Sequence, residues 1–239
     1  MYVNTKALQH SMARVISLLG PPGSGKGTYG SLLASRFLNA SFVSVGDILR
    51  ENAVGNEHLT SILRSGALVD DALVNDVVMQ SMEDRAREKD VVLLDGYPRT
   101  GPQSQLLAKW PVGLRPMLAL HFDVPYAVCT AKLLGRRTCS ICNKSINVKR
   151  VDTHGFNLPP MVPEAGACRV NCKPDEDWVN REDDTADTIK LRMKIYHKET
   201  TPVLRYWKER GQLLSYVPYN GVKDIDALKS LVEARFHSL

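Results

Sequence analysis

The chain of 239 residues lacks the features that mark several classes of protein. No apolar run approaches the roughly 18 to 20 residues of a membrane-spanning helix, so we expect no membrane segment. The five cysteines are odd in number and follow no secretory leader, which argues against a disulfide scaffold. No dense block of lysine and arginine marks a nucleic-acid-binding face. The net charge of +5 suits small polyanionic substrates at least as well as a nucleic acid.

Acidic residues are missing from the start of the chain, where the first is Asp47. An acid-free leader over residues 1–13 slightly favours a mitochondrial transit peptide, but the leader is short because a strand begins by Val15. We therefore predict an N-terminal extension and a cytoplasmic protein, with a mitochondrial location as the alternative. No spare apolar face is evident in the pattern, so a monomer is expected.

An apolar run followed by a glycine-rich loop is the main feature that the sequence does have. Val15–Leu19 is continuously hydrophobic, apart from one serine, as a strand buried in a parallel sheet would be, and it leads into GPPGSGKGT over Gly20–Thr28. Apolar residues then recur at helical spacing. This order predicts a P-loop, in which backbone N–H groups and a helix N-terminus surround a phosphate. Lys26 would reach the β- and γ-phosphates, and Thr28 would offer its hydroxyl to Mg²⁺.

A second apolar strand, Val91–Asp95, ends in a carboxylate. In a P-loop fold this is the position of the aspartate that organises Mg²⁺ and its waters, so Asp95 is the candidate. Arg99 follows a turn containing Gly96, at the strand end where ligands bind in open α/β sheets. Its guanidinium could make a bidentate contact with phosphate oxygens there. Gln103 opens the next helix, and its amide can donate and accept at the edge of a base.

The remaining core segments alternate between strand and helix patterns, which predicts a parallel sheet with right-handed crossovers. Strands are expected over Met117–Phe122 and Gln212–Val217, and helices over Asp71 to about Lys89, Pro125–Leu134 and Ile225–Phe236. Arg136 and Arg137 follow one of these helices, where they could cap its C-terminus or clamp a triphosphate. Between Thr138 and Val179 the aliphatic periodicity fades and prolines gather, so we interpret this segment as an insertion outside the sheet.

Six motifs resemble those of the adenylate kinase family, in the same order along the chain. They are GPPGSGKGT (Gly20–Thr28), SVGDILR (Ser44–Arg50), SGALVDD (Ser65–Asp71), DGYPRTGPQ (Asp95–Gln103), GRR (Gly135–Arg137) and NREDDTADTIKLR (Asn180–Arg192). Together they span most of the chain, and Gly27 after the P-loop lysine is the family's own variant.

The resemblance implies an α/β fold of the P-loop NTPase type, in which a parallel sheet is flanked by helices and carries an inserted NMP-binding arm and a lid domain. The implied division of the chain has an N-terminal extension of residues 1–13, a core of residues 14–43, 74–135 and 185–239, an arm of residues 44–73 and a lid of residues 136–184. We use the names arm and lid for these segments below.

The resemblance also implies the reaction, which is Mg²⁺-dependent phosphoryl transfer from ATP to AMP to give two ADP. The ATP-binding residues would be Gly23, Ser24, Gly25, Lys26, Gly27, Thr28 and Arg136. The AMP-binding residues would be Arg50, Ala67, Leu68, Val69, Gly96, Arg99, Gln103, Arg181 and Arg192. The catalytic group would be Lys26, Arg99, Arg136, Arg181 and Arg192, with Asp183 and Asp184 helping to seat the closed lid. Thr28 and Asp95 would bind Mg²⁺, partly through water.

Three positions bear on which nucleotides are used. Val45 stands where adenylate kinases usually have threonine beside AMP, and pyrimidine monophosphate kinases are apolar there. Gln103 favours AMP as the acceptor, because pyrimidine monophosphate kinases lack this Pro-Gln pair. Lys132 replaces an arginine that many members place against the ATP base, which leaves GTP open as a donor. A GTP:AMP phosphotransferase and a UMP/CMP kinase are therefore the alternatives within the family.

The cysteines of the lid form two close pairs, Cys139 with Cys142 and Cys168 with Cys172. Many lids of this family contain a four-cysteine zinc knuckle that begins at the first pair, and thiolates bound to zinc could stabilise a loop too small for its own core. The second pair has one residue more than the usual spacing. The sequence therefore favours structural Zn²⁺ and leaves unliganded thiols and a disulfide as the alternatives.

The sequence gives less support to two functions from other classes. A zinc-containing, nucleic-acid-binding P-loop protein would need clustered surface lysines and arginines with interleaved aromatic residues, which the sequence does not show. A silent nucleotide sensor would be expected to lack Lys26 or one of the arginines, and all are present.

Overall fold

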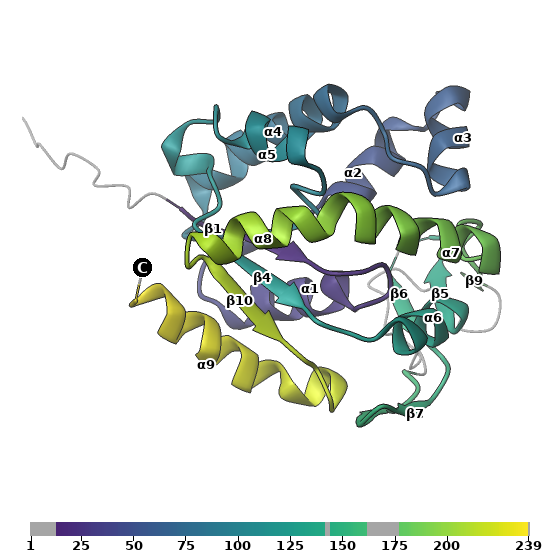
Figure 1. Ribbon diagram of the computed structural model, residues 1–239. Helices are drawn as coiled ribbons and strands as arrows, with labels where there is room; N and C mark the ends of the chain where they lie inside the picture. The colour runs from purple at the N-terminus through teal and green to yellow at the C-terminus, as the bar shows by residue number, and fades with distance from the viewer. Residues whose placement is uncertain (1–12, 142–143, 162–176, 239) are drawn as a thin grey trace, which may run out of the picture.

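The computed structural model describes residues 13–141, 144–161 and 177–238. Within them a five-stranded parallel sheet forms the centre of the molecule (Figure 1). Its order is β10-β4-β1-β3-β2, with strands β1 (Arg14–Leu19), β2 (Ala40–Ser44), β3 (Val91–Asp95), β4 (Leu118–Phe122) and β10 (Leu213–Tyr216). The α/β class and the parallel sheet predicted from the sequence are confirmed.

Helices cover both faces of this sheet. The α-helices are α1 (Lys26–Arg36), α2 (Val45–Asn52), α3 (Glu57–Ser65), α4 (Asp71–Glu88), α5 (Gly101–Leu107), α6 (Tyr126–Leu134), α7 (Ala186–Ile195), α8 (Thr201–Glu209) and α9 (Ile225–Phe236). Short 3₁₀ turns occur at η1 (Val112–Leu114) and η3 (Gly221–Asp224), and a π-helical segment, η2 (Tyr196–Thr200), joins α7 to α8.

Alternate side chains of the central strands enter two separate cores. In β1, Val15 and Leu19 belong to the core formed with α4 and α8, whereas Ile16 and Leu18 belong to the core formed with α1, α6 and α9. All four side chains are essentially inaccessible to solvent. This double burial explains why the strand sequence is almost continuously apolar instead of alternating.

The arm and the lid extend from the carboxyl-end side of the sheet. In the arm, α2 and α3 lie above the sheet in Figure 1. In the lid, β5 (Arg136–Cys139) pairs antiparallel with β6 (Ser145–Asn147) and β9 (Trp178–Val179), and β7 (Val151–Thr153) pairs with β8 (Phe156–Leu158). These pairings form no part of the central sheet.

Several elements differ from the sequence expectations. The helix α3 was not predicted, although Asn56 caps its N-terminus and Gly66, in the left-handed region, ends it. Arg136 and Arg137 begin a lid strand instead of only following a helix. No helix in the described part of the chain is long and apolar enough to cross a membrane.

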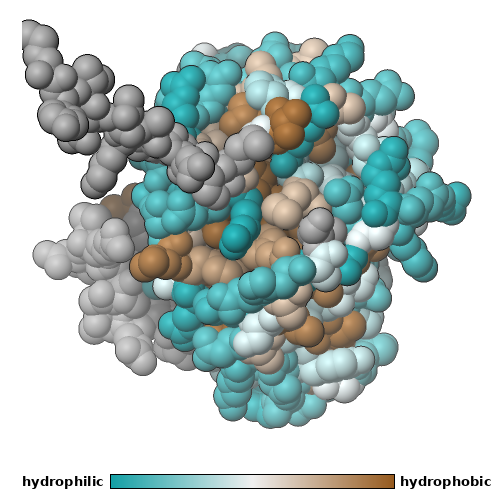
Figure 2. All heavy atoms as spheres, turned by 90° about the vertical axis from the view of Figure 1, so that its left-hand side faces the viewer, coloured by the Kyte–Doolittle hydropathy of each residue, from teal (hydrophilic) through white to brown (hydrophobic). Residues whose placement is uncertain are grey.

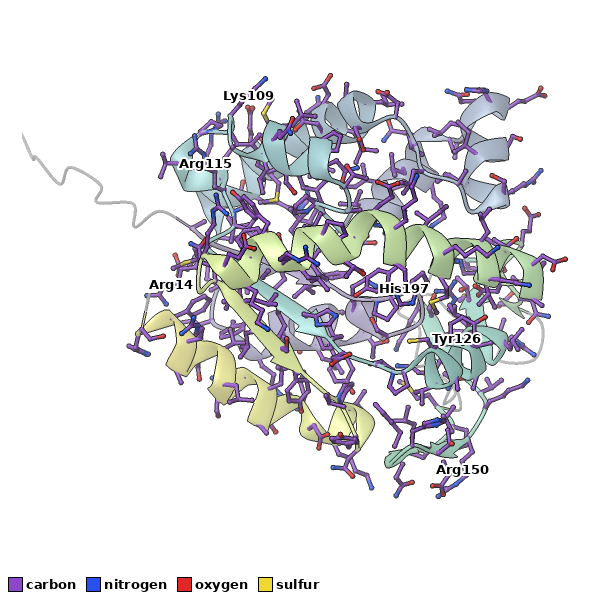
Figure 3. The ribbon with its side chains drawn as sticks, in the orientation of Figure 1. Arg14, Lys109, Arg115, Tyr126, Arg150 and His197 are labelled. Atoms are coloured by element: carbon purple, nitrogen blue, oxygen red, sulfur yellow. The ribbon has the colours of Figure 1, made fainter. Side chains whose placement is uncertain are left out.

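The amino ends of the strands form the opposite side of the molecule, which Figure 2 shows face on. Hydrophilic side chains there surround several groups of apolar ones. Figure 3 places Arg14, Lys109 and Arg115 at this end, away from the lid strands. These basic residues are therefore remote from the carboxyl ends of the strands, where the candidate site lies.

Candidate active site

Two cavities meet at the carboxyl ends of the strands. A cavity of about 500 Å³ lies between the arm, the loop after β3 and the lid, and we call it the first cavity. A cavity of about 640 Å³, the second cavity, lies between the P-loop, the lid and the segment 220–223. Four arginines predicted as ligands of phosphate line both cavities, namely Arg50, Arg99, Arg181 and Arg192. These four arginines lie in α2, in the loop after β3, in the lid and in α7, and together they form a wall that the two cavities share.

The P-loop brings Lys26 into the second cavity. Helix α1 begins at Lys26, after Gly25 in a left-handed conformation. The Lys26 Nζ donates to the carbonyl oxygens of Gly20 (2.8 Å) and Pro21 (3.0 Å). Burial lowers the pKa of Lys26 to about 8, against the opposing effect of Asp95. A negatively charged ligand in this cavity would stabilise the protonated ammonium.

The other P-loop residues divide between the cavity and the interior. The second cavity is lined by Gly23, Gly25, Gly27 and Thr28. Ser24 is fully buried and lines neither cavity, and its Oγ has no hydrogen-bond partner in the described part of the chain. Its predicted contact with ATP would therefore have to come from its backbone.

Asp95 supplies a buried carboxylate beside the P-loop. Its Oδ1 has no hydrogen-bond partner among the described residues, and burial raises its pKa although Lys26 and Arg99 act in the opposite direction. Asp95 and Thr28 both line the second cavity. Carboxylate and hydroxyl oxygens are donors that Mg²⁺ prefers, directly or through water, so this pair fits the ion.

The turn after β3 fixes the backbone of Arg99. The Tyr97–Pro98 peptide is cis, and Gly96 has a positive φ of 82°. A Cβ on Gly96 would come within 2.7 Å of the Arg99 guanidinium, whose Nε donates to the Gly96 carbonyl (2.9 Å). Thr200, in the π-helical segment, donates its hydroxyl to the Arg99 carbonyl (2.9 Å). Glycine is thus favoured here by the positive φ, and a larger residue would also displace the Arg99 guanidinium.

Gln103 lies in the wall of the first cavity and is almost completely buried. Its Oε1 accepts from the Arg99 backbone N–H (2.7 Å), and its Nε2 donates to Asp71 Oδ1 (2.8 Å). The remaining predicted AMP-binding residues, Ala67, Leu68, Val69 and Gly96, also line the first cavity.

The lid arginines are paired with aspartates. Arg136 makes a two-pronged contact with Asp184, with both N–O distances 2.6 Å. Asp183 accepts from Arg181 (3.1 Å) and Arg192 (2.8 Å). Burial alone would raise the pKa of Asp183, but these two guanidinium groups hold it below its usual value. Asp184 lines neither cavity, so it acts on the site through the arginines that it binds.

The arm and the lid touch across the mouth of the first cavity. Arg64 of α3 pairs with Glu182 at 2.5 Å. A Cβ on Gly66 would lie 2.7 Å from the Thr188 side chain and 2.9 Å from that of Arg192, so the arm packs directly against α7. Arg64, Glu182 and Arg50, which is paired with Asp47, all line the first cavity.

Three of the four lid cysteines, Cys142, Cys168 and Cys172, lie outside the described residues. Cys139 is buried at the end of β5 and lines the first cavity. Among the described residues no group of three or more histidine, cysteine, aspartate or glutamate side chains is placed to bind a metal. Cys129, on α6, is buried in the core.

Sequence reasoning missed residues that complete the site. Asp71 and Thr200 contact Gln103 and Arg99 but lie 32 and 101 positions away from them in the chain. The second cavity is also lined by Asn147 of the lid and by Lys223. Asp71 ends the SGALVDD motif, but that motif does not indicate its contact with Gln103, and no motif contains the other three, because these roles arise from packing between separate segments.

Comparison with known proteins agrees with this geometry. Residues 18–212 match the family model described as adenylate kinase. The chain is 32% identical over 224 residues to a GTP:AMP phosphotransferase of Plasmodium falciparum, which covers 91% of this chain and 95% of that protein. It is 36% identical over 220 residues to an adenylate kinase of Clostridium botulinum, covering 88% and 93%. It is 37% identical over 213 residues to one of Gloeobacter violaceus, covering 84% and 90%. The chain therefore belongs to the adenylate kinase family of enzymes, which transfer phosphoryl groups between nucleotides.

Proposed function

We propose that the protein catalyses reversible phosphoryl transfer from ATP to AMP, giving two ADP. The observation that supports this reaction most directly is the wall shared by the two cavities, which contains Arg50, Arg99, Arg181 and Arg192. A transferred phosphoryl group has to pass between two polyanions, and cations at their junction would neutralise both.

The two cavities suit different substrates. The P-loop and Lys26 make the second cavity the site of ATP, with Arg136 on its lid side. The arm and the Gln103 amide make the first cavity the site of AMP, with the backbone of Ala67–Val69 beside the base. The terminal phosphoryl group of ATP would then face the AMP phosphate at the shared wall.

Positioning and charge neutralisation account for the chemistry. Phosphoryl transfer requires little covalent work from the protein, and the AMP phosphate is already an anion at neutral pH, so no general base is needed. Lys26, Arg99, Arg136, Arg181 and Arg192 would stabilise the charge on the transferred group. Closure of the lid over the site excludes water, which would otherwise hydrolyse ATP.

Magnesium is the cofactor that these residues fit. Thr28 and Asp95 would hold it, partly through water, and it would supply positive charge to offset that of the donor phosphates. The unpartnered Oδ1 of Asp95 is the observation that supports this assignment.

A structural zinc in the lid is a separate proposal. Asp177 accepts a hydrogen bond from Ser140 at 2.8 Å, so the chain returns beside Cys139 five residues after Cys172. That return supports a structural site built from Cys139, Cys142, Cys168 and Cys172. Because Cys139 also lines the first cavity, such a site would adjoin the proposed AMP site. Metal analysis of the purified protein would decide the point. One equivalent of zinc per chain is expected, and a metal-free lid with unliganded thiols or a disulfide would contradict it.

The reaction is tested by incubating the protein with Mg-ATP and each nucleoside monophosphate in turn, followed by separation of the products. We expect ADP from ATP and AMP, with UMP and CMP poor acceptors because of Gln103. Comparable turnover of CMP would show that Val45, which lines the first cavity, determines the acceptor instead.

GTP as the phosphoryl donor is the second candidate. Lys132 lines the second cavity and donates to the Ser24 carbonyl (3.2 Å), and burial lowers its pKa to about 8. Repeating the assay with GTP in place of ATP distinguishes the two donors. A higher kcat/KM with GTP would make the protein a GTP:AMP phosphotransferase.

We further infer that the arm and the lid move as units on the core, that the protein is a monomer and that it acts in the cytoplasm. Sedimentation of the purified chain would test the assembly state. Imaging of the tagged full-length chain would separate a cytoplasmic from a mitochondrial location.

A further inference from the structure

The amide of Gln103 is held in one of its two orientations by partners that cannot exchange roles. Its Oε1 accepts from the Arg99 backbone N–H, which can only donate (2.7 Å). Its Nε2 donates to Asp71 Oδ1 (2.8 Å), and an ionised carboxylate only accepts. The same Asp71 oxygen accepts from Thr100 Oγ1 (3.0 Å), which in turn accepts from the Gln103 backbone N–H (3.1 Å). If the amide turned over, its NH₂ group would face the Arg99 N–H and its carbonyl oxygen would face the Asp71 carboxylate.

The part of the amide left for a ligand is therefore defined. A primary amide has two N–H donors and two lone pairs. Within the described chain, Asp71 uses one N–H and Arg99 uses one lone pair, so one of each remains. Gln103 is 2% exposed and lines the first cavity, so the remaining donor and acceptor are available there in a fixed order.

We propose that Asp71 is a positioning residue for base specificity, because together with the Arg99 backbone N–H it locks Gln103 in the order that matches a 6-aminopurine and opposes a 6-oxopurine. The proposal rests on the proposed function, since it requires AMP in the first cavity. A 6-aminopurine presents an amino donor next to a ring-nitrogen acceptor. A 6-oxopurine presents the reverse, a carbonyl acceptor next to an N–H donor. A free amide could turn to match either base, and a locked amide cannot.

The position of Asp71 separates this role from helix capping. Asp71 is the first residue of α4, but Asp70 caps that helix, with its Oδ1 accepting from the backbone N–H groups of Ala72 (3.1 Å) and Leu73 (3.0 Å). The Asp71 carboxylate is thus available for Gln103 and Thr100 on α5 and the loop before it. Asp71 does not line either cavity, so it acts on a base only through Gln103.

The test compares AMP with inosine monophosphate, which differs from AMP in the atoms that the Gln103 amide would contact. With Mg-ATP as donor, the kcat/KM ratio of AMP to inosine monophosphate is measured for the wild-type protein and for Asp71→Ala. We expect the ratio to fall about 10- to 100-fold in the variant, the usual effect of one buried, unmatched hydrogen-bonding group. If the wild type gives no detectable inosine diphosphate, formation of inosine diphosphate by the variant would itself show that the ratio has fallen.

Two further variants distinguish loss of the Asp71 hydrogen bond from a general effect on helix α4. Asp71→Asn keeps the shape and an acceptor oxygen but can turn its own amide, so its ratio should lie between those of the wild type and Asp71→Ala. Asp70→Ala is the matched control, because it removes the cap of the same helix without touching Gln103. It should lower thermal stability and keep the wild-type ratio.

A double-mutant cycle separates positioning from general damage. In a Gln103→Leu background there is no amide to turn, so Asp71→Ala should not change the ratio further. A ratio within about twofold of the wild type in both Asp71 variants would overturn the proposal, as would an equal change in the Gln103→Leu background. The proposed function fails differently, because a wild-type protein that forms no ADP from AMP would refute it before any variant is made.

Discussion

The cations of the core and those of the lid are stabilised in different ways. Lys26 and Arg99, from the core, donate to backbone carbonyl oxygens of their own loops and make no ion pair with a described residue. Arg136 and Arg181, from the lid, and Arg192 beside it are paired with Asp183 or Asp184. The lid arginines therefore have their charge largely balanced, whereas Lys26 and Arg99 have no ion pair in the part of the chain that the structure describes, and mainly the nearby carboxylate of Asp95 offsets their charge.

This difference assigns separate tasks to the two groups. A buried cation without an ion pair costs stability, which the lowered pKa of Lys26 reflects, but it attracts a polyphosphate strongly. Paired arginines attract less, yet the carboxylates hold their guanidinium groups in defined positions before a substrate arrives. The core cations thus mainly attract the substrate phosphates, and the lid arginines are mainly held in position. Each of these two roles can be tested separately.

The largest effect is expected from a core cation without a side-chain partner. Arg99→Ala should keep the fold, because Arg99 contributes backbone contacts that alanine retains. Its loss from the shared cavity wall should lower kcat by about 10³-fold or more, the scale of arginines that stabilise transferred phosphoryl groups. Turnover of ATP with AMP measures the effect. Arg87→Ala, which removes an exposed guanidinium from α4, is the matched control and should keep the wild-type rate. An unchanged rate in Arg99→Ala would remove Arg99 from the site.

A smaller effect is expected when the lid geometry is loosened and no cation is lost. Asp183→Asn leaves Arg181 and Arg192 in place but removes the charge that positions them. We expect kcat to fall about 10- to 100-fold through misalignment, with a smaller change in KM. Asp187→Asn removes one charge from the exposed first turn of α7 and should leave kcat unchanged. A larger change in KM than in kcat would contradict the positioning role of Asp183.

The local parts of the core could be predicted from the sequence, because neighbouring residues define them. The glycine-rich loop between β1 and α1 and the carboxylate at the end of β3 are set by local patterns, and the structure places Lys26 and Asp95 in one cavity. The continuous hydrophobicity of β1 and β3 likewise follows from burial on both sheet faces.

The rest could not be predicted, for identifiable physical reasons. The lid strands have two to four residues, too few for a periodic pattern to be recognised. The contacts of Asp71 with Gln103 and of Thr200 with Arg99 join residues far apart in the chain, so only the folded backbone brings them together. The helix α3 did have readable signals, because Asn56 and Gly66 are typical capping residues, and these signals were overlooked.

A third prediction concerns stability instead of rate. Burial lowers the pKa of Lys26 from 10.5 to about 8, so the folded protein binds fewer protons than the unfolded chain between these pH values. Below about pH 8 the full cost of the buried charge is present, and it is relieved as the pH rises towards 10.5. Lys26→Met should abolish activity yet raise Tm at pH 7 by a few degrees. The gain over the wild type should shrink by pH 10.

The control for this measurement is Lys190→Met, which removes an exposed lysine from α7. It should show no comparable, pH-dependent gain in Tm. A Lys26→Met protein that is less stable than the wild type at pH 7 would mean that the Lys26 contacts with Gly20 and Pro21 outweigh the cost of burying its charge.

The smallest effect is expected from the exposed ion pair between the arm and the lid. Arg64 and Glu182 are 62% and 69% exposed, so their attraction is screened by water and is worth about 0.2–1 kcal/mol. Glu182→Gln should therefore change kcat or KM by less than about fivefold. The change should disappear in 1 M salt, where the screening length falls to about 3 Å. The exchanged pair Arg64→Glu with Glu182→Arg should restore the wild-type values at low salt. A large effect that persists at high salt would show that Glu182 helps to position Asp183 and Asp184. This exposed pair would then belong with the ion pairs that hold the lid arginines in place.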